Sequence, residues 1–200
     1  MRESQFLIRD EIHRVIRDAR RRARTSRQAR LNLTIFRLSC CCGLRVSEIC
    51  GLNCGDLKLQ TDRPEIHVRK ETAKGKKGRY VKIWWDKGTL DDLRIWLGIR
   101  LGQGAKANDP FICGQFGTSG KRLTRDLAAK RWRTAIQVLG PERVKQLHIH
   151  CGRHSYISHS LASGRSLPEV QENVGHSSIG STNAYVHFIE STRNLPDVFG

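Results

Sequence analysis

The sequence has few acidic residues for its number of basic ones, and it has no long apolar run. Only 19 Asp and Glu stand against 36 Lys and Arg, so the net charge is +17. No apolar run approaches the ~20 residues that a transmembrane helix needs, and the first residues do not form a secretory signal pattern. We therefore expect a cytoplasmic protein with no membrane partner. So large a positive excess predicts a polyanionic partner, with nucleic acid favoured over an anionic membrane surface.

Paired cysteine motifs are also missing. The chain has 7 cysteines, an odd number, and none of them forms a CxxC pair. In a reducing compartment they are better interpreted as small buried hydrophobic residues than as a disulfide framework. A zinc site is conceivable where His148, His150, Cys151 and His154 lie close in sequence. The glutamate of an HExxH motif is absent there, so we expect no metal.

A complete nucleotide-binding loop is also missing. Residues 114–122 read GQFGTSGKR and resemble a P-loop at first sight. Gln115 stands where the first glycine is required, and Arg122 follows Lys121 where the motif needs Ser or Thr. We therefore exclude ATP and expect no cofactor.

What the sequence does have is helical periodicity over most of its length. The apolar spacing predicts helices over residues 7–23, 27–42, 47–50, 89–101, 124–139, 150–162, 167–174 and 178–188. Two β-branched and aromatic segments, 65–70 and 79–85, predict one hairpin. Asp10, Ser26 and Thr89 are candidate N-caps, and Gly43 is a candidate helix stop. The predicted fold class is mainly α with a small antiparallel β-hairpin or sheet (α+β), in a single domain over residues 1–200.

Basic residues gather at two places. Six arginines follow the polar face of the first predicted helix, namely Arg14, Arg17, Arg20, Arg21, Arg22 and Arg24. They form either a solvated face or a phosphate-binding face, and their number on one helix favours phosphate binding. The turn between the predicted strands holds Lys74, Lys76 and Lys77; a lysine-rich turn by itself is more often simply solvated.

Two further arginines have partners at short spacing. Arg45 precedes a short apolar helix, and Glu48 can hold its guanidinium by a charge-assisted hydrogen bond. The alternative is an ordinary surface ion pair. His150 and Arg153 lie one helical turn apart and can point at one target. Guanidinium and imidazole groups together with a downstream tyrosine hydroxyl suit a phosphodiester, since arginine donates to phosphate oxygens in a fixed plane.

The order of these motifs resembles the catalytic domain of the tyrosine recombinases, the phage-integrase, Xer and Cre superfamily. The motifs are GLRVSE around Arg45, AKGKKGR around Lys74, HxxRH from His150 to His154, GHSS from Gly175 and TNAYVH around Tyr185. Each motif alone is weak, but five in this order are specific, and the resemblance covers about residues 5–190. It implies the DNA breaking-rejoining fold and a site-specific recombinase or integrase.

The resemblance also implies a role for each residue in metal-independent strand cleavage. Tyr185 would attack the phosphorus to give a 3′-phosphotyrosyl intermediate, while Arg45 and Arg153 hold the phosphate oxygens. Lys74 would protonate the departing 5′-hydroxyl, with Lys76 and Lys77 as competitors. His150 would transfer a proton, His176 would hydrogen-bond the phosphate, and Glu48 would support Arg45. The residues expected to contact double-stranded DNA are Arg14, Arg17, Arg21, Arg24, Lys76, Lys77 and Arg79.

Alternatives remain at the level of the residue and of the function. Tyr156 lies on the same helix face as Arg153 and is the rival nucleophile. His154, His159 and His187 are expected to be structural or outward-facing. A DNA-binding accessory protein that keeps the fold without turnover, and a type IB topoisomerase-like relaxase, are the alternative functions.

Three departures from the family pattern bear on these expectations. The N-terminal DNA-clamping (core-binding) domain of full-length members is absent, so the chain is either a fragment or a short form. Cys151-Gly152 stands between His150 and Arg153, and a glycine there costs about 1 kcal/mol of helix propensity and is expected to lose a core contact. The tail, residues 189–200, is apolar enough to be exchanged with a neighbouring protomer. On DNA the protein would be associated with the nucleoid.

Overall fold

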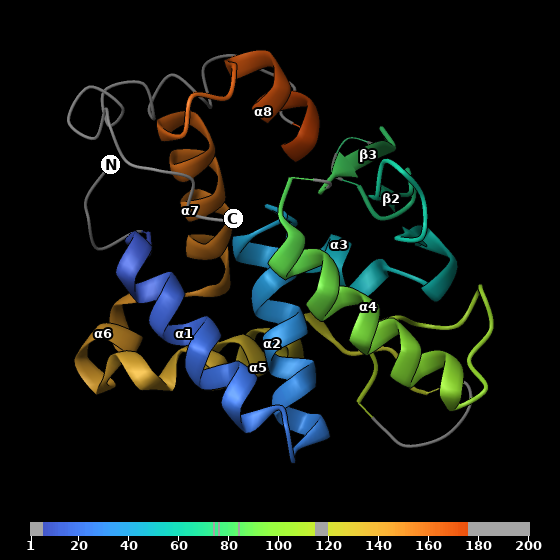
Figure 1. Cartoon of the computed structure of the whole chain (residues 1–200), viewed down its shortest axis with the longest axis horizontal. Coiled ribbons are helices and arrows are strands. Elements are labelled where there is room, and N and C mark those ends of the chain that lie inside the picture. The colour runs from blue at the N-terminus through green and yellow to red at the C-terminus, as the bar shows by residue number, and fades with distance from the viewer. Residues whose placement is uncertain (1–5, 74, 76, 84, 115–119, 176–200) are drawn as a thin grey trace.

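The helix α2, Arg27–Cys40, lies at the centre of the fold, and four long helices pack around it (Figure 1). The computed structural model describes residues 6–73, 75, 77–83, 85–114 and 120–175. Every residue of α2 from Leu31 to Cys40 is buried, including the polar residues Asn32, Thr34, Arg37 and Ser39, so the helix is enclosed by its neighbours on all sides. The four surrounding helices are α1 (Arg9–Arg22), α4 (Lys87–Gly102), α5 (Arg125–Ala135) and α7 (Ile149–Ala162).

The helix starts follow capping chemistry, but two of the expected caps were wrong. The backbone N–H of Ile8 donates to the carboxylate of Glu11 at 3.0 Å, so α1 begins after Ile8 and Asp10 lies inside its first turn. In α4, Asp86 is the N-cap and accepts from the backbone N–H of Thr89 at 2.8 Å, so Thr89 is an interior residue. Ser26 caps α2 as expected, accepting from the N–H of Ala29 at 3.2 Å.

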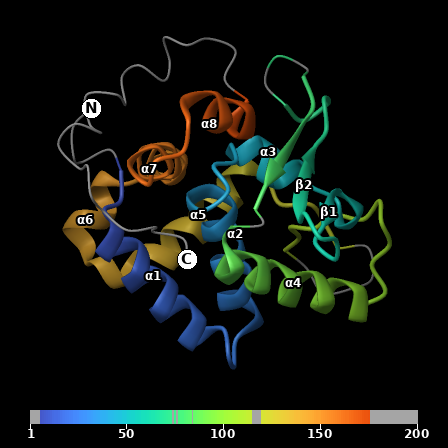
Figure 2. The ribbon, with the colours of Figure 1, turned by 45° about the horizontal axis from the view of Figure 1, so that its top comes forward.

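The predicted hairpin is present and belongs to a three-stranded antiparallel sheet of order β1-β2-β3. Its strands are β1 (Leu57–Lys58), β2 (Glu65–Val68) and β3 (Arg79–Lys82). In the β2–β3 register Ile66 pairs with Val81, and both side chains are buried. The sheet lies on the side of α2 away from α1 (Figure 2). Sequence periodicity missed β1, because two residues are too few to show an alternation.

The remaining elements mostly agree with the prediction. The predicted helix 124–139 consists of α5 followed by the 3₁₀ helix Ile136–Leu139. The short helices α3 (Val46–Gly51) and α8 (Leu167–Val174) are where the spacing placed them, whereas α6 (Pro141–Gln146) was missed. The predicted helix 178–188 lies outside the described residues. The fold class, mainly α with a small antiparallel sheet, is confirmed, and no described helix is long and apolar enough to cross a membrane.

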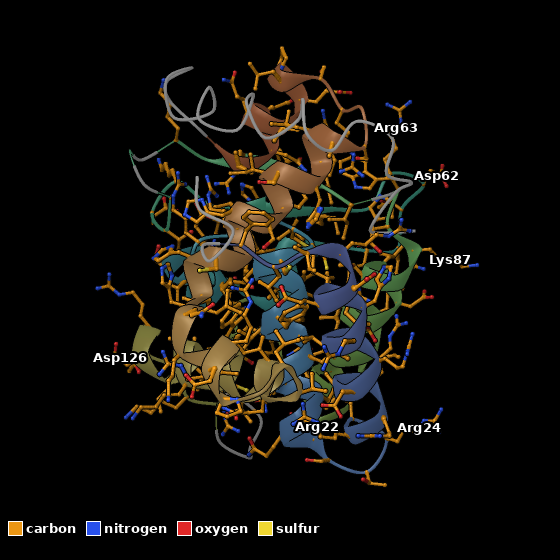
Figure 3. All side chains as sticks on the ribbon, turned by 90° about the vertical axis from the view of Figure 1, so that its left-hand side faces the viewer. Arg22, Arg24, Asp62, Arg63, Lys87 and Asp126 are labelled. Atoms are coloured by element: carbon orange, nitrogen blue, oxygen red, sulfur yellow. The ribbon has the colours of Figure 1, made fainter. Side chains whose placement is uncertain are left out.

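The turn between α1 and α2 lies at the end of the molecule opposite α8. Arg22 and Arg24 mark this turn at the bottom of Figure 3, while α8 lies at the top. The length of α2, about 21 Å at 1.5 Å per residue, therefore separates the end of α1 from the segment that follows α2. That segment contains Arg45.

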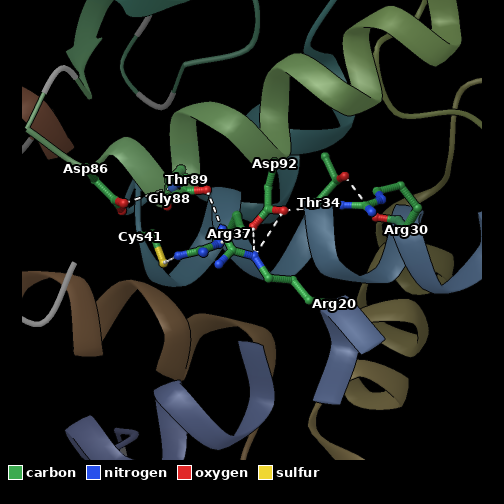
Figure 4. Close-up of polar contacts among 9 residues, drawn as sticks. All are labelled: Arg20, Arg30, Thr34, Arg37, Cys41, Asp86, Gly88, Thr89 and Asp92. Atoms are coloured by element: carbon green, nitrogen blue, oxygen red, sulfur yellow. Dashed lines mark hydrogen bonds and ion pairs between the residues drawn. The ribbon is translucent and has the colours of Figure 1, made fainter. Parts of the chain in front are cut away.

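Part of the basic face of α1 is used inside the protein (Figure 4). Asp92 of α4 is buried and accepts from Arg20 at 3.0 Å, from Arg30 at 3.2 Å and from Arg37 at 3.0 Å. Burial alone would lower the pKa of Arg37, but the neighbouring Cys41, Asp86 and Asp92 raise it above its ordinary value. These ion pairs tie α1, α2 and α4 together, so not all of the positive charge is available to a polyanion.

Helix α7 packs closely against α2 at Gly152. A Cβ atom at this position would lie 2.6 Å from the hydroxyl oxygen of Ser39. That hydroxyl donates to the carbonyl of Phe36 at 3.0 Å and accepts from the indole N–H of Trp132 at 2.7 Å, so it cannot move freely. The expected loss of a core contact at Gly152 was therefore wrong, because the backbone itself makes the contact.

We expect Gly152→Ala to lower the free energy of unfolding by about 1–3 kcal/mol, because the added methyl group overpacks the α2–α7 contact. The loss occurs despite alanine's higher helix propensity. Gly98→Ala is the matched control: Gly98 is exposed in α4 with nothing near its Cβ position, and the change is expected to stabilise by about 0.5–1 kcal/mol. Urea unfolding measures the free energy of unfolding of both variants. Equal stabilisation by the two changes would contradict the close contact between α7 and α2 at Gly152.

Candidate active site

Arg45 is held at the start of α3 by Glu48. Its backbone N–H donates to one carboxylate oxygen of Glu48 at 2.8 Å, and its Nη1 donates to the other at 3.1 Å. Glu48 is fully buried, and the Arg45 side chain is 19% exposed. The predicted Arg45–Glu48 interaction is therefore present and is not an ordinary surface ion pair.

Arg153 projects from α7 to the loop that follows α2. Its Nη1 donates to the carbonyl of Gly43 and its Nη2 to the carbonyl of Val174, both at 2.6 Å. Gly43 has φ +67°, and a Cβ atom there would lie 2.5 Å from the Tyr156 ring. Only glycine satisfies both conditions, so the predicted helix stop also provides the carbonyl that orients Arg153.

Three arginines converge on the last turn of α8. Arg79 donates through Nε to the carbonyl of Asn173 at 2.8 Å, Arg153 donates to that of Val174, and Arg45 donates through Nη2 to that of Gly175 at 3.4 Å. Consecutive carbonyls at a helix C-terminus lack helical partners and carry the negative end of the helix dipole. This turn thus gathers guanidiniums from three distant segments, an arrangement that the sequence did not reveal.

Glu48 balances only part of this charge. Both of its oxygens accept from Arg79, at 2.8 and 3.0 Å, in addition to the bonds from Arg45. Burial alone would raise the pKa of Glu48, but the hydrogen bond and charge of Arg79, with Arg45 and Arg153, hold it below its ordinary value. The carboxylate is therefore ionised, and three guanidiniums against one carboxylate leave positive charge for an incoming anion.

His150 lies in the first turn of α7, close to this cluster. Its ring makes an edge contact with His148, with the centroids 6.1 Å apart. Partial burial lowers the pKa of His150, and the positive charges of His148, Arg153 and Arg45 lower it further. A neutral imidazole at neutral pH can accept a proton, which suits the role expected of it.

The rival nucleophile and the other histidines have structural positions. Tyr156 is buried, its hydroxyl accepts from the amide of Asn173 at 2.5 Å, and burial raises its pKa. His159 is buried with Nε2 2.8 Å from the carbonyl of Leu7, and His154 is half-buried. All seven cysteines are free and buried, as expected. Among the described residues, the cluster containing His148 and Cys151 does not form a metal site.

Several predicted residues fall outside the described part of the chain, namely Lys74, Lys76, His176, Tyr185 and the tail 189–200. Arg79, expected to contact DNA, has a side chain only 8% exposed that is directed to Glu48 and Asn173. Lys77 is exposed in the turn before β3.

The arginines of α1 and of the turn after it lie away from the cluster. Arg14 donates to the carbonyl of Val138 at 3.2 Å, and Arg21 pairs with Asp18 at 2.6 Å. Arg17 and Arg24 are exposed. Contacts of these four arginines with DNA stay predictions.

Comparison with known proteins gives a consistent family match. A model of the phage integrase family matches residues 5–191. The tyrosine recombinase XerC of Azotobacter vinelandii is 34% identical over 160 residues, which are 80% of this chain and 48% of that protein. XerC of Pseudomonas aeruginosa (strain PAO1) is 36% identical over 160 residues, with the same shares of 80% and 48%. The chain thus spans about half the length of these relatives.

Solved structures show the same fold at lower identity. The XerA recombinase matches with a TM-score of 0.72 and 22% identity, over 96% of this chain and 59% of that one. The XerH site-specific recombinase bound to palindromic difH substrate, in a post-cleavage complex, matches with a TM-score of 0.69 and 22% identity, over 93% and 50% of the two chains. At these identities the likeness concerns the fold.

Proposed function

This chain belongs to the phage integrase family, and from this premise we propose that it is the catalytic domain of a tyrosine-type site-specific DNA recombinase. The observation that carries the proposal is the placement of Arg45 and Arg153 on neighbouring carbonyls of one helix end. Two guanidiniums held side by side can grip the two non-bridging oxygens of a single phosphodiester. We take residues 5–188 as the catalytic unit.

The proposed reaction exchanges one phosphodiester for another. The Tyr185 oxygen forms a bond to phosphorus, the bond from phosphorus to the 5′-oxygen breaks, and a 3′-phosphotyrosyl link remains. His150 takes the phenol proton, Lys74 gives a proton to the departing 5′-oxygen, and His176 donates to the phosphate. The reverse reaction rejoins the strand without ATP, because the covalent link keeps the energy of the original bond.

The described side chains provide the electrostatic part of this reaction. Arg45 uses Nη1 for Glu48 and Nη2 for Gly175, and among the described residues its Nε–H has no protein acceptor. An arginine has five N–H donors, so Arg45 keeps donors for a phosphate. Glu48 and the carbonyl of Gly175 fix the position of the Arg45 guanidinium before DNA arrives, which is the preorganisation that lowers a transition-state barrier.

Double-stranded DNA is the partner that the charge and the family both support. The related XerH structure is described as bound to its difH substrate, and the net charge of +17 suits a polyanion. We propose that further contacts along the DNA come from Arg14, Arg17, Arg21, Arg24, Lys76 and Lys77, and that the tail 189–200 joins protomers assembled on it. A protein of this kind would act in the cytoplasm, at the nucleoid.

Covalent trapping tests the function. The protein is incubated with nicked suicide duplexes drawn from a panel of candidate attachment sites, and denaturing gels reveal any protein–DNA adduct. Mass spectrometry of the digested adduct then identifies the modified residue, which we expect to be Tyr185.

Other results separate the alternatives. DNA binding with no adduct on any duplex would favour an accessory protein. Relaxation of supercoiled plasmid by monomers, with no strand exchange, would favour a relaxase.

A further inference from the structure

Asn173 is a buried polar residue in the last turn of α8, where the sequence predicted an ordinary helical position. Its Oδ1 accepts from the backbone N–H of Lys82 at 2.8 Å, and its Nδ2 donates to the carbonyl of Lys82 at 3.2 Å. The same Nδ2 donates to the hydroxyl of Tyr156 at 2.5 Å. Asn173 is only 3% exposed, and the hydrogen bonds of its carboxamide go to β3 and to α7.

These bonds connect α8 to the sheet and to α7. Lys82 ends β3, which is an edge strand of the sheet. The carboxamide occupies the open N–H and C=O of Lys82 as a further strand would, so it fixes the distance between α8 and β3. Through Tyr156 it also fixes α8 to the helix that carries Arg153.

The main chain at the same place orients the arginine cluster. The carbonyl of Asn173 is the first of the three that accept from Arg79, Arg153 and Arg45. A shift of α8 against β3 would therefore move all three acceptors together.

We propose that Asn173 is a positioning residue for strand cleavage: by anchoring the α8 C-terminal turn to Lys82 and Tyr156, it aligns the carbonyls that hold Arg45 and Arg153 at the scissile phosphate. The expected effect on the cleavage rate rests on the proposed function. The alignment of the three carbonyls rests only on the hydrogen bonds of Asn173. Asn173 touches neither DNA nor the reacting atoms in this scheme.

The kinetic test compares Asn173→Leu with Glu172→Ala. Leucine keeps the volume and the helix but removes every side-chain bond; Glu172 is an exposed neighbour in the same turn whose carboxylate pairs with the Lys82 ammonium. Misplacing catalytic groups by about 1 Å costs about 10²-fold in rate, so the single-turnover cleavage rate of Asn173→Leu should fall by about that factor while its DNA dissociation constant stays within about threefold. Glu172→Ala should cleave at the wild-type rate. Wild-type cleavage by Asn173→Leu, or parallel losses of affinity and rate, would overturn the proposal.

A second variant and a spectroscopic readout keep the test independent of folding and of activity. Tyr156→Phe removes one acceptor of Asn173 and should slow cleavage less than Asn173→Leu, still at unchanged affinity; if Asn173→Leu does not fold, Asn173→Ser replaces it. In the free protein, the Arg79 Nε–H resonance should be protected from solvent exchange in the wild type and lose protection in the Asn173 variants. Unchanged protection would overturn the proposal even if the wild type forms no adduct, whereas absence of an adduct with lost protection contradicts only the proposed function.

Discussion

Replacing Tyr185 with phenylalanine is expected to abolish the covalent protein–DNA adduct completely, because the phenyl ring has no oxygen to attack the phosphorus. The chain has 3 tyrosines. Of the other two, Tyr156 is buried and Tyr80 is exposed. The Tyr156 hydroxyl is buried against Asn173, where burial raises its pKa and keeps it protonated. Tyr80 is exposed on β3 and stacks on His67, with the ring centroids 4.7 Å apart. We expect neither to replace Tyr185 as the nucleophile.

The measurement is the adduct yield on a suicide duplex at saturating protein. Tyr80→Phe is the matched control, since Tyr80 is an exposed phenol of the described chain and its replacement should leave the yield unchanged. Tyr185→Phe should still shift the duplex in a native gel, because its basic residues are intact. An adduct that persists in Tyr185→Phe would refute the assignment of the nucleophile, and its disappearance in Tyr80→Phe would reassign it.

Sequence reasoning succeeded where the interaction is local. The Arg45–Glu48 bond joins residues three apart, and the apolar spacing identified α1, α2, α7 and α8 because each buries one side or all sides against neighbours. The site beyond Glu48 depends on contacts between residues far apart in sequence. Arg79 and Asn173 are 94 residues apart, and Arg45 and Gly175 are 130 apart. No periodicity reports such a contact, so the sequence did not reveal that Arg79 donates to Glu48 and to Asn173.

The charge pattern was informative about the partner but less so about position. An excess of arginine predicted a polyanion, yet Arg20, Arg30 and Arg37 are directed at Asp92 inside the helical packing. Sequence alone cannot separate an arginine that binds phosphate from one that binds a buried carboxylate, because both need the same planar donor. To distinguish the two cases one must know which acidic residue faces the arginine in the fold. Here that residue is Asp92, which lies on a different helix from the three arginines.

The second large effect is expected at Glu48. Removing one partner from a buried ion cluster typically costs about 3–5 kcal/mol, so Glu48→Ala should lower the free energy of unfolding by about that amount. The change leaves Arg45, Arg79 and Arg153 facing one another without their carboxylate. Cleavage should fall as well, since Arg45 loses the bond that orients it. Urea unfolding measures the first effect, and sulfate should restore stability more in the variant than in the wild type, because an anion then replaces the carboxylate.

Glu48→Gln separates charge from shape and gives a pH signature. The folded-state pKa of Glu48 lies below its ordinary value of 4.5, so its ionised form stabilises the fold. This contribution is fully present above that ordinary value and is lost as the pH falls through the lower, folded pKa. The difference in unfolding free energy between wild type and Glu48→Gln should therefore be constant above about pH 5 and shrink in more acidic solution. Glu172→Gln, a change at an exposed carboxylate, should show almost no such difference. A wild-type advantage that persists unchanged into acid would mean that Glu48 acts through packing rather than through its charge.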